Sequence, residues 1–245
     1  MKKILLVLTL FVGILMVSCG KKEEANGKKV VIVGTNAEFP PFEFLEGDKV
    51  TGFDIELLTE VSKIAGFEIE IKNQSFDGLL PALQSGKIDL IVSGMTVTDE
   101  RKKAVNFTDS YYTASQVIIV ANNNEAVKGF EDLKGKNVGV QLGTTGDLEV
   151  SKMVDVTNTK FNNGSEAILA LKSNKVDAVV IDNEPAKNFV KNNDGLKVVD
   201  AGAIKEDYAM AISKDNQELL NSINAALKQL KENGKYDELM KKWFK

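Results

Sequence analysis

The chain has 245 residues, a formal net charge of −4, no histidine and a single cysteine, Cys19. The lack of histidine excludes the commonest general base, Ser-His and Cys-His nucleophile pairs and the usual zinc ligands. No cluster of basic residues follows the first few positions, so neither nucleic acid nor an anionic lipid surface is an expected partner.

The first 18 residues have the pattern of a secretory signal peptide. Two lysines precede an apolar run over residues 4–17, in which Thr9 is the one polar residue, and small residues then lead to Cys19. The run is too short for a membrane span, which needs about 20 apolar residues. The segment Leu15-Met16-Val17-Ser18-Cys19 resembles a bacterial lipobox, with Met16 where leucine is usual. That resemblance implies that Cys19 becomes a lipidated first residue anchored to a membrane.

A first α/β unit follows residues 19–29, a charged segment that we interpret as a flexible tether. Folding is expected to begin near Val30 with a buried strand over 30–34. A helix over 55–65 follows, with Asp54 as its cap and Gly66 at its end. Strands over 67–71 and 88–92 flank a helical stripe over 79–83. This βαβαβ order predicts a parallel sheet.

A second α/β unit begins with a β-rich run over 116–121. A strand is expected over 138–141, and the turn Gly143-Thr144-Thr145-Gly146-Asp147 opens a helix. A helical stripe over 167–171 precedes a strand over 176–181, and Pro185 fits the first turn of another helix. The second unit is therefore predicted to resemble the first.

One segment is repeated in the two units. Residues 82–89, Ala-Leu-Gln-Ser-Gly-Lys-Ile-Asp, align with residues 170–177, Ala-Leu-Lys-Ser-Asn-Lys-Val-Asp, and five of the eight pairs are identical. At the same spacing Ser93 and Gly94 correspond to Ile181 and Asp182, just beyond equivalent strands. A chance recurrence of helix, lysine and strand is the alternative.

The chain continues with a strand over 208–212, an amphipathic helix over 219–230 and a short helix ending at Trp243 and Phe244. Nothing here begins a third unit, so these helices are expected to pack on the first. The chain then crosses between lobes near 115–117 and 209–211, and two crossings form a hinge. We predict lobe 1 from residues 30–115 and 212–245, and lobe 2 from residues 116–211.

Residues 93–101, Ser-Gly-Met-Thr-Val-Thr-Asp-Glu-Arg, join an apolar run to the start of a polar helix. Strand ends are where α/β proteins hold ligands. Thr98 fits the N-cap, but Arg101 is a cation in the first turn, where the helix dipole disfavours one. A ligand carboxylate held by backbone N–H groups and Arg101 would remove this conflict. A solvated surface arginine is the alternative.

An ordered set of motifs resembles the polar amino-acid-binding proteins of bacterial ABC importers. The motifs are Gly34-Thr35-Asn36, Pro40-Pro41-Phe42-Glu43, Gly52-Phe53-Asp54, Phe76-Asp77-Gly78, Leu83-Gln84-Ser85-Gly86, residues 93–101 and Lys241-Lys242-Trp243-Phe244. The resemblance implies an α/β, two-lobed type II periplasmic-binding-protein fold. Each lobe would have a mainly parallel sheet flanked by helices, and the lobes would close on one free amino acid. No catalytic residue, cofactor or metal is expected.

The resemblance also implies how the charged ends of the amino acid are held. Arg101 would clasp the α-carboxylate with help from Thr96 and from the helix start at Thr144 and Thr145. Acceptors at Ser93 and Gly94 and the carboxylate of Asp182 would meet the α-amino group. Physical chemistry supports a charged partner at each end, because burying an unpaired ion costs several kcal/mol.

The ligand side chain would lie between Phe39 and Phe76, with Asn36 and Gln141 where the family sets its specificity. Each assignment has a structural alternative. Asp182 would cap the helix at Pro185, the two phenylalanines would be core residues, and Thr96 would support a turn. Gly94 would serve a positive φ, and Asn36 and Gln141 would face water.

Asn36 stands where basic-amino-acid and glutamine binders often have aspartate, which argues against direct charge pairing with an arginine or lysine ligand at this position. The amides of Asn36 and Gln141 both accept and donate hydrogen bonds, so a polar or cationic amino acid is expected: lysine, arginine, histidine or glutamine. The other expected partners are an ABC permease and, through the lipid anchor only, a membrane. We expect an extracytoplasmic monomer, anchored to the bacterial cell membrane or facing the periplasm.

Two other functions stay open. A cyclohexadienyl-dehydratase-like enzyme on the same fold would need a catalytic acid beside the substrate, and Glu38 is the only candidate. A ligand-sensing or adhesin-like surface protein would use the same pocket without a transporter.

Overall fold

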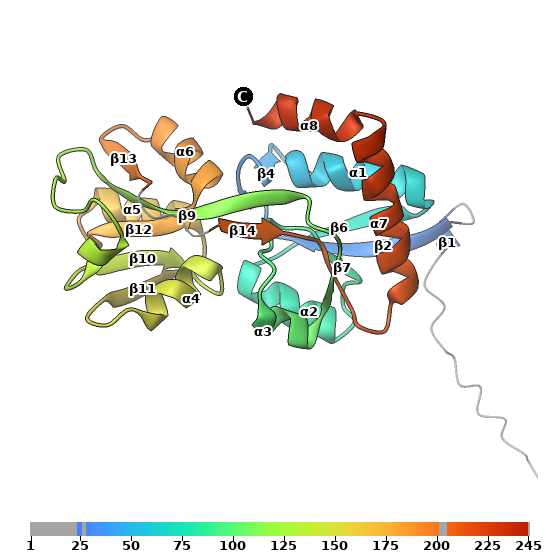
Figure 1. Ribbon diagram of the computed structural model, residues 1–245, viewed down its shortest axis with the longest axis horizontal. Coiled ribbons are helices and arrows are strands. Elements are labelled where there is room, and N and C mark those ends of the chain that lie inside the picture. Colours follow the sequence, from blue (N-terminus) through green and yellow to red (C-terminus); the bar gives the residue numbers. More distant parts are fainter. Residues whose placement is uncertain (1–23, 26–27, 201–204, 245) are drawn as a thin grey trace, which may run out of the picture.

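The computed structural model describes residues 24–25, 28–200 and 205–244. The predicted signal peptide and Cys19 lie outside the described residues. The chain forms two lobes, each with its own sheet, joined by a long strand, β9 (Tyr112–Ala121), and a short strand, β14 (Lys205–Tyr208), that pairs with it (Figure 1). Among the described residues, no helix combines the length and the apolar character that crossing a membrane requires. The predicted two-lobed α/β architecture is confirmed.

The sheet of the first lobe is built around β2 (Lys28–Thr35), which pairs in parallel with β6 (Glu68–Asn73) and β7 (Leu90–Ile91). β15 (Ala211–Ile212) pairs antiparallel with β7 and with β8 (Asn106–Phe107). β2 begins inside the segment expected to be a tether, and β1 (Glu24–Ala25) pairs antiparallel with its first residues. The segment therefore contains paired strand residues, which its charged composition did not indicate.

Helices cover both faces of this sheet, as a central strand with consecutive apolar residues requires. Val31 and Val33 point into the core beneath α1 (Phe53–Ala65) and α7 (Gln217–Glu232), while Ile32 packs on the other side with α2 (Leu79–Gln84). α3 (Asp99–Ala104) lies on the same side as α2 (Figure 1). The carboxyl end of β2 faces the second lobe, because Asn36, the residue after β2, accepts a hydrogen bond from Gln141 of that lobe. β7 is parallel to β2 and ends at the same edge of the sheet.

The sheet of the second lobe has the order β11-β10-β12-β9-β13. β10 (Asn137–Gln141) pairs in parallel with β11 (Thr157–Phe161) and β12 (Ala178–Asp182). β9 (Tyr112–Ala121) is antiparallel to β12 and to β13 (Leu196–Val199). The helices of this lobe are α4 (Thr145–Lys152), α5 (Gly164–Lys172) and α6 (Asn183–Lys191). Two short 3-10 turns complete the described helices, η1 (Phe76–Gly78) and η2 (Phe130–Leu133).

Two paired strands connect the lobes. β14 (Lys205–Tyr208) runs antiparallel to β9, from the pair Lys205 and Ser115 to the pair Tyr208 and Tyr112. The single strand expected over 208–212 is divided, because β14 ends at Tyr208 and β15 begins in the other sheet at Ala211. The residue boundaries predicted for the lobes stay a prediction.

The repeated segment has the same local structure in both lobes. The backbone N–H of Asp89 donates to Ile32 O over 2.7 Å, and its side chain accepts from Ile32 N over 3.0 Å. Asp177 makes the matching bonds to Asn137, at 2.7 and 2.8 Å. Each aspartate thus ties the chain before β7 or β12 to the neighbouring parallel strand, β2 or β10.

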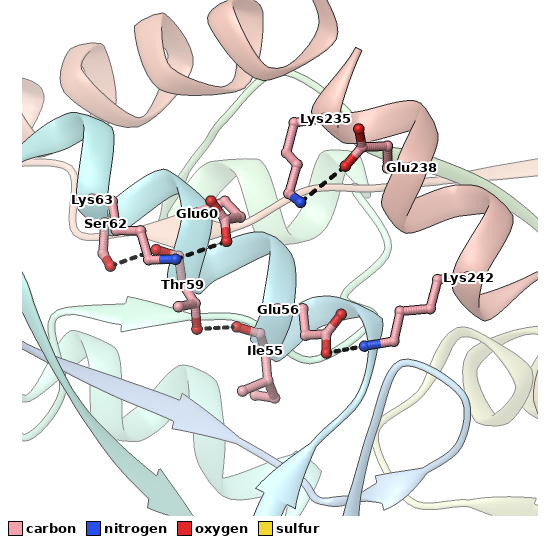
Figure 2. Close-up of polar contacts among 9 residues, drawn as sticks. All are labelled: Ile55, Glu56, Thr59, Glu60, Ser62, Lys63, Lys235, Glu238 and Lys242. Atoms are coloured by element: carbon pink, nitrogen blue, oxygen red, sulfur yellow. Dashed lines mark hydrogen bonds and ion pairs between the residues drawn. The ribbon is translucent and has the colours of Figure 1, made fainter. Parts of the chain in front are cut away.

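The last helix, α8 (Lys235–Trp243), is fixed to the first lobe by polar and aromatic contacts. Lys242 pairs with Glu56 of α1 (Figure 2), and Trp243 Nε1 donates to the same carboxylate over 2.9 Å. The Phe244 ring centre lies 5.0 Å from that of Phe53 and 4.8 Å from that of Tyr112. The end of the described chain therefore packs against the connecting strand β9.

Candidate ligand-binding site

All the residues expected at the site line one cavity between the lobes. The lining residues are Asn36, Phe39, Glu43, Phe76, Ser93, Gly94, Thr96, Arg101, Gln141, Thr144, Thr145 and Asp182. Several of them stand at or just beyond the carboxyl ends of β2, β7, β10 and β12, where the crevice of an α/β sheet lies. Most of these side chains are buried, so a solute reaches them only when the lobes separate.

Arg101 is buried at the start of α3 and is not a solvated surface residue, since its exposure is 6%. Thr98 caps the helix by accepting from Arg101 N over 3.1 Å. The guanidinium donates to Thr96 O over 2.7 Å and to Gly143 O, in the other lobe, over 3.0 Å. It also lies over the Phe76 ring, 5.5 Å from the ring centre.

Burial lowers the pKa of Arg101, while the charges of Glu206 and Asp182 oppose this shift. Arginine nevertheless stays protonated in proteins. Within residues 28–200 and 205–244, no carboxylate forms an ion pair with its guanidinium. The guanidinium of Arg101 is therefore available to form an ion pair with an anionic group of a ligand.

Asp182 supplies a buried negative charge at the end of β12. Its Oδ1 accepts from the Tyr208 hydroxyl over 2.6 Å. It is the N-cap residue of α6, but its side chain makes no capping hydrogen bond, so a pure capping role is wrong. Burial, with the charge of Glu206, raises the pKa of Asp182 from 3.8 to about 7. A cationic group in the cavity would offset this cost.

Ser93 and Gly94 donate hydrogen bonds to two buried acids, Glu43 and Asp54, which the sequence analysis did not assign to the site. The Ser93 hydroxyl donates to Glu43 Oε1 over 2.9 Å, and Gly94 N donates to Asp54 Oδ2 over 2.8 Å. Asp54 therefore does not cap α1, whose N-cap is Gly52. Gly94 does have a positive φ of 48°, so its backbone also favours glycine.

Asn36 and Gln141 join the two lobes directly. Gln141 Nε2 donates to Asn36 Oδ1 over 2.9 Å, and Asn36 Nδ2 donates to Gln74 O over 3.1 Å. Both side chains are buried, so the alternative that they face water is wrong. Their amides lie where either a donor or an acceptor of a ligand side chain can be met.

Thr96 and Thr145 bind a carboxylate of the protein itself. Glu206 Oε2 accepts from Thr96 Oγ1 over 2.9 Å, from Thr145 Oγ1 over 2.7 Å and from Gln116 Nε2 over 3.1 Å. A hydroxyl has only one proton to donate, so both threonine protons are engaged. The hydroxyl of Thr145 is therefore not free to donate to a ligand carboxylate. At this end of lobe 2, the remaining donors for such a carboxylate are the backbone N–H groups at the start of α4.

Phe39 and Phe76 belong both to the cavity wall and to the core clusters. Phe39 stacks on Phe42, with ring centres 6.2 Å apart. Glu38, the candidate acid for an enzyme, is exposed on β3 (Glu38–Phe39) and does not line the cavity.

Comparison with known proteins gives the same picture. Residues 31–245 match the bacterial extracellular solute-binding proteins, family 3. The arginine-binding extracellular protein ArtP of Bacillus subtilis is 40% identical, with 100% of this chain and 98% of ArtP covered. Among solved structures, an ancestral arginine-binding protein bound to arginine is 48% identical, with a TM-score of 0.85, and covers 88% of this chain and 98% of its own. The arginine-, lysine-, histidine-binding protein ArtJ of Geobacillus stearothermophilus is 43% identical, with a TM-score of 0.84 and coverages of 88% and 95%.

Proposed function

Because the chain belongs to family 3 of the bacterial extracellular solute-binding proteins, we propose that it captures a free polar or cationic amino acid between its lobes and delivers it to an ABC permease. The observation that carries this proposal is the buried pair of opposite charges, Arg101 and Asp182, on the wall of one cavity. Such a pair matches the carboxylate and the ammonium of a zwitterion, each of which needs a partner on losing its hydration.

The charges around the cavity favour a cationic side chain on the ligand. Asp182 lines the cavity, Glu206 accepts hydrogen bonds from the lining residues Thr96 and Thr145, and Asp54 accepts from Gly94, whereas Arg101 is the one cation among the residues that line the cavity. The relatives named above bind arginine, or arginine, lysine and histidine. Arginine, lysine and histidine therefore come before glutamine as candidate ligands.

The proposal extends to how the protein is held outside the cell. Cys19 would carry the lipid, residues 1–18 would be removed, and the folded lobes would stay near the permease. Lobe 1 would comprise residues 30–115 and 212–245, and lobe 2 residues 116–211, with β9 and β14 as the hinge. No observation favours the enzyme, since the relatives are named as binding proteins and Glu38 is exposed.

Thermal unfolding of the protein with each of the twenty amino acids at about 1 mM tests this function. A ligand of the native state stabilises it by RT ln(1 + [L]/Kd), about 4 kcal/mol at a thousandfold excess over Kd. We expect one chemical class, the cationic amino acids, to raise the midpoint by several degrees. No shift with any of the twenty would contradict the proposal.

A further inference from the structure

Three of the sequence motifs meet beside Ser93 and Gly94, where the α-amino group of the ligand is expected. They are residues 40–43, residues 52–54 and the start of the segment 93–101. Phe53 N and Asp54 N donate to Pro41 O and Phe42 O, each over 2.9 Å. Gly52 permits this approach, because a Cβ atom there would lie 2.1 Å from Phe42 O. The backbone thus holds the side chains of Glu43 and Asp54 together beneath residues 93–94.

The carboxyl groups of Glu43 and Asp54 are both buried, and each accepts hydrogen bonds from the protein on one oxygen only. Ser93 donates to Glu43 Oε1, and Gly94 N and Tyr111 OH donate to Asp54 Oδ2. The remaining oxygens, Glu43 Oε2 and Asp54 Oδ1, are buried and have no N–H or O–H donor in the described chain. One proton held between these two oxygens would give each of them a hydrogen-bond partner.

Burial and mutual repulsion favour one proton on the Glu43 and Asp54 pair at neutral pH. Burial, and then the charge of Asp54, raise the pKa of Glu43 well above its usual range. Burial raises the pKa of Asp54 only to about 6, because the Gly94 N–H and the Tyr111 hydroxyl stabilise its charge. The pair therefore carries one negative charge.

This arrangement decides what Ser93 presents to the cavity. Its proton goes to Glu43 Oε1, and one lone pair accepts from Asn36 N over 3.0 Å. A hydroxyl has one proton and two lone pairs, so a lone pair is the only valence left for the cavity. With the Glu43 proton on Oε1 instead, Ser93 would have to turn a donor toward the ligand.

We propose that Glu43 and Asp54 are positioning residues whose shared proton, held between them, fixes Ser93 as an acceptor for the α-ammonium group of the ligand. The inference rests on the proposed function, since it requires an amino acid as ligand. The two acids act through Ser93 and Gly94 and need not touch the ligand themselves.

Amide substitutions test the shared proton. In Glu43→Gln the amide oxygen accepts from Ser93 and the NH₂ group donates to Asp54. In Asp54→Asn the NH₂ group donates to Glu43, which is then ionised. Each single variant keeps one negative charge and one donor between the groups, so we expect L-arginine to bind within about threefold of the wild-type affinity. In the double variant two NH₂ groups face each other or one turns toward Ser93, and we expect a loss of about tenfold or more.

Calorimetric titration at pH 7.5 measures these affinities, and 5-guanidinopentanoic acid, which is arginine without its α-amino group, is the control ligand. The double variant should bind the control as the wild type does, because the control makes no bond to Ser93. A tenfold loss of affinity for L-arginine in Glu43→Gln alone would overturn the proposal. This single variant therefore decides the question even if the double variant fails to fold. Equal losses for both ligands, or none in the double variant, would also overturn it.

Ser93→Ala provides the matching background. Ser93→Ala should lower the affinity for L-arginine by about tenfold or more. Adding the two amide substitutions to this variant should lower the affinity no further. If the wild type bound none of the twenty amino acids, the proposed function itself would fail. If the wild type bound L-arginine and the variants behaved additively, only the present inference would fail.

Discussion

Arg101 is a buried cation whose guanidinium donates hydrogen bonds to two backbone carbonyl oxygens. Replacing it with alanine should leave the ligand carboxylate unpaired, so we expect Arg101→Ala to weaken amino-acid binding by about 2–5 kcal/mol. Lys102→Ala, at the exposed neighbouring position, is the matched control and should bind as the wild type does. Near-normal affinity of Arg101→Ala in a calorimetric titration would reject the assigned role.

Asp182 makes the stability of the unliganded protein depend on pH, and its raised pKa fixes the sign of this dependence. Its pKa is raised in the folded state by burial and by Glu206, with Tyr208 and Gln116 opposing the shift as hydrogen-bond partners. The folded state therefore binds the proton more tightly than the unfolded state. The stabilising contribution is complete below pH 3.8 and is lost as the pH rises through about 7. One such group changes the free energy of unfolding by at most about 1.4 kcal/mol per pH unit.

Denaturant unfolding of wild type and Asp182→Asn between pH 4 and 8 checks this sign. We expect the stability of the wild type to fall across the range and that of the variant to fall less steeply. Glu43 and Asp54 also have raised pKa values and add to the same slope, so part of it should persist in the variant. An identical slope in the two proteins would show that Asp182 is not held in a costly ionised state.

At the scale of elements, Gly52 allows the start of α1 to approach the backbone of the segment before β4 (Glu43–Glu46) closely. Its φ of 123° lies in a region that only glycine adopts readily, and a Cβ would collide with the Phe42 carbonyl. We expect Gly52→Ala to lower the free energy of unfolding by more than about 3 kcal/mol.

The matched control is Gly47→Ala, in the turn between β4 and β5 (Lys49–Thr51). Gly47 also has a positive φ, 61°, but a Cβ there would have nothing within 4 Å. Its cost should be the left-handed strain alone, about 1–2 kcal/mol. Equal unfolding midpoints for the two variants would mean that the close approach at Gly52 contributes nothing.

The elements that could be predicted from the sequence are those with a strong local pattern. β2 and β10 are consecutive apolar runs buried on both faces, and α7 has a clear apolar stripe. β11 is mainly polar, and β11 and β13 are the two edge strands of their sheet. The three-stranded sheet of β3, β4 and β5 has strands of two to four residues. Such short strands carry no periodicity, so only the folded chain reveals them.

The same limit applies to the site. Arg101 was recognisable because a cation conflicts locally with a helix start. Glu43, Asp54 and Glu206 have no such local conflict, and their partners are 40 to 110 residues away along the chain. For Glu43 and Asp54 a signal was present, because both stand in the motifs that carried the family resemblance. Their chemical role depends on burial and on each other, which no single segment encodes.

At the scale of the whole molecule, the cavity is closed by bonds between the lobes, including Gln141 to Asn36 and Arg101 to Gly143. A ligand enters only if these bonds open, and ligand contacts from both sides then stabilise the compact state. We expect small-angle scattering to give a smaller radius of gyration with saturating L-arginine than without it. An unchanged radius would contradict closure of two lobes on the ligand.

Recognition of a zwitterion by two opposite charges is tested most directly by changing the ligand and leaving the protein intact. Calorimetric titration would compare L-arginine with argininamide, which lacks the carboxylate, and with 5-guanidinopentanoic acid, which lacks the α-amino group. We predict that each analogue binds weaker by about a hundredfold or more, because Arg101 or the Asp182 end of the cavity is left without its partner. Affinities of either analogue close to that of L-arginine would contradict the account.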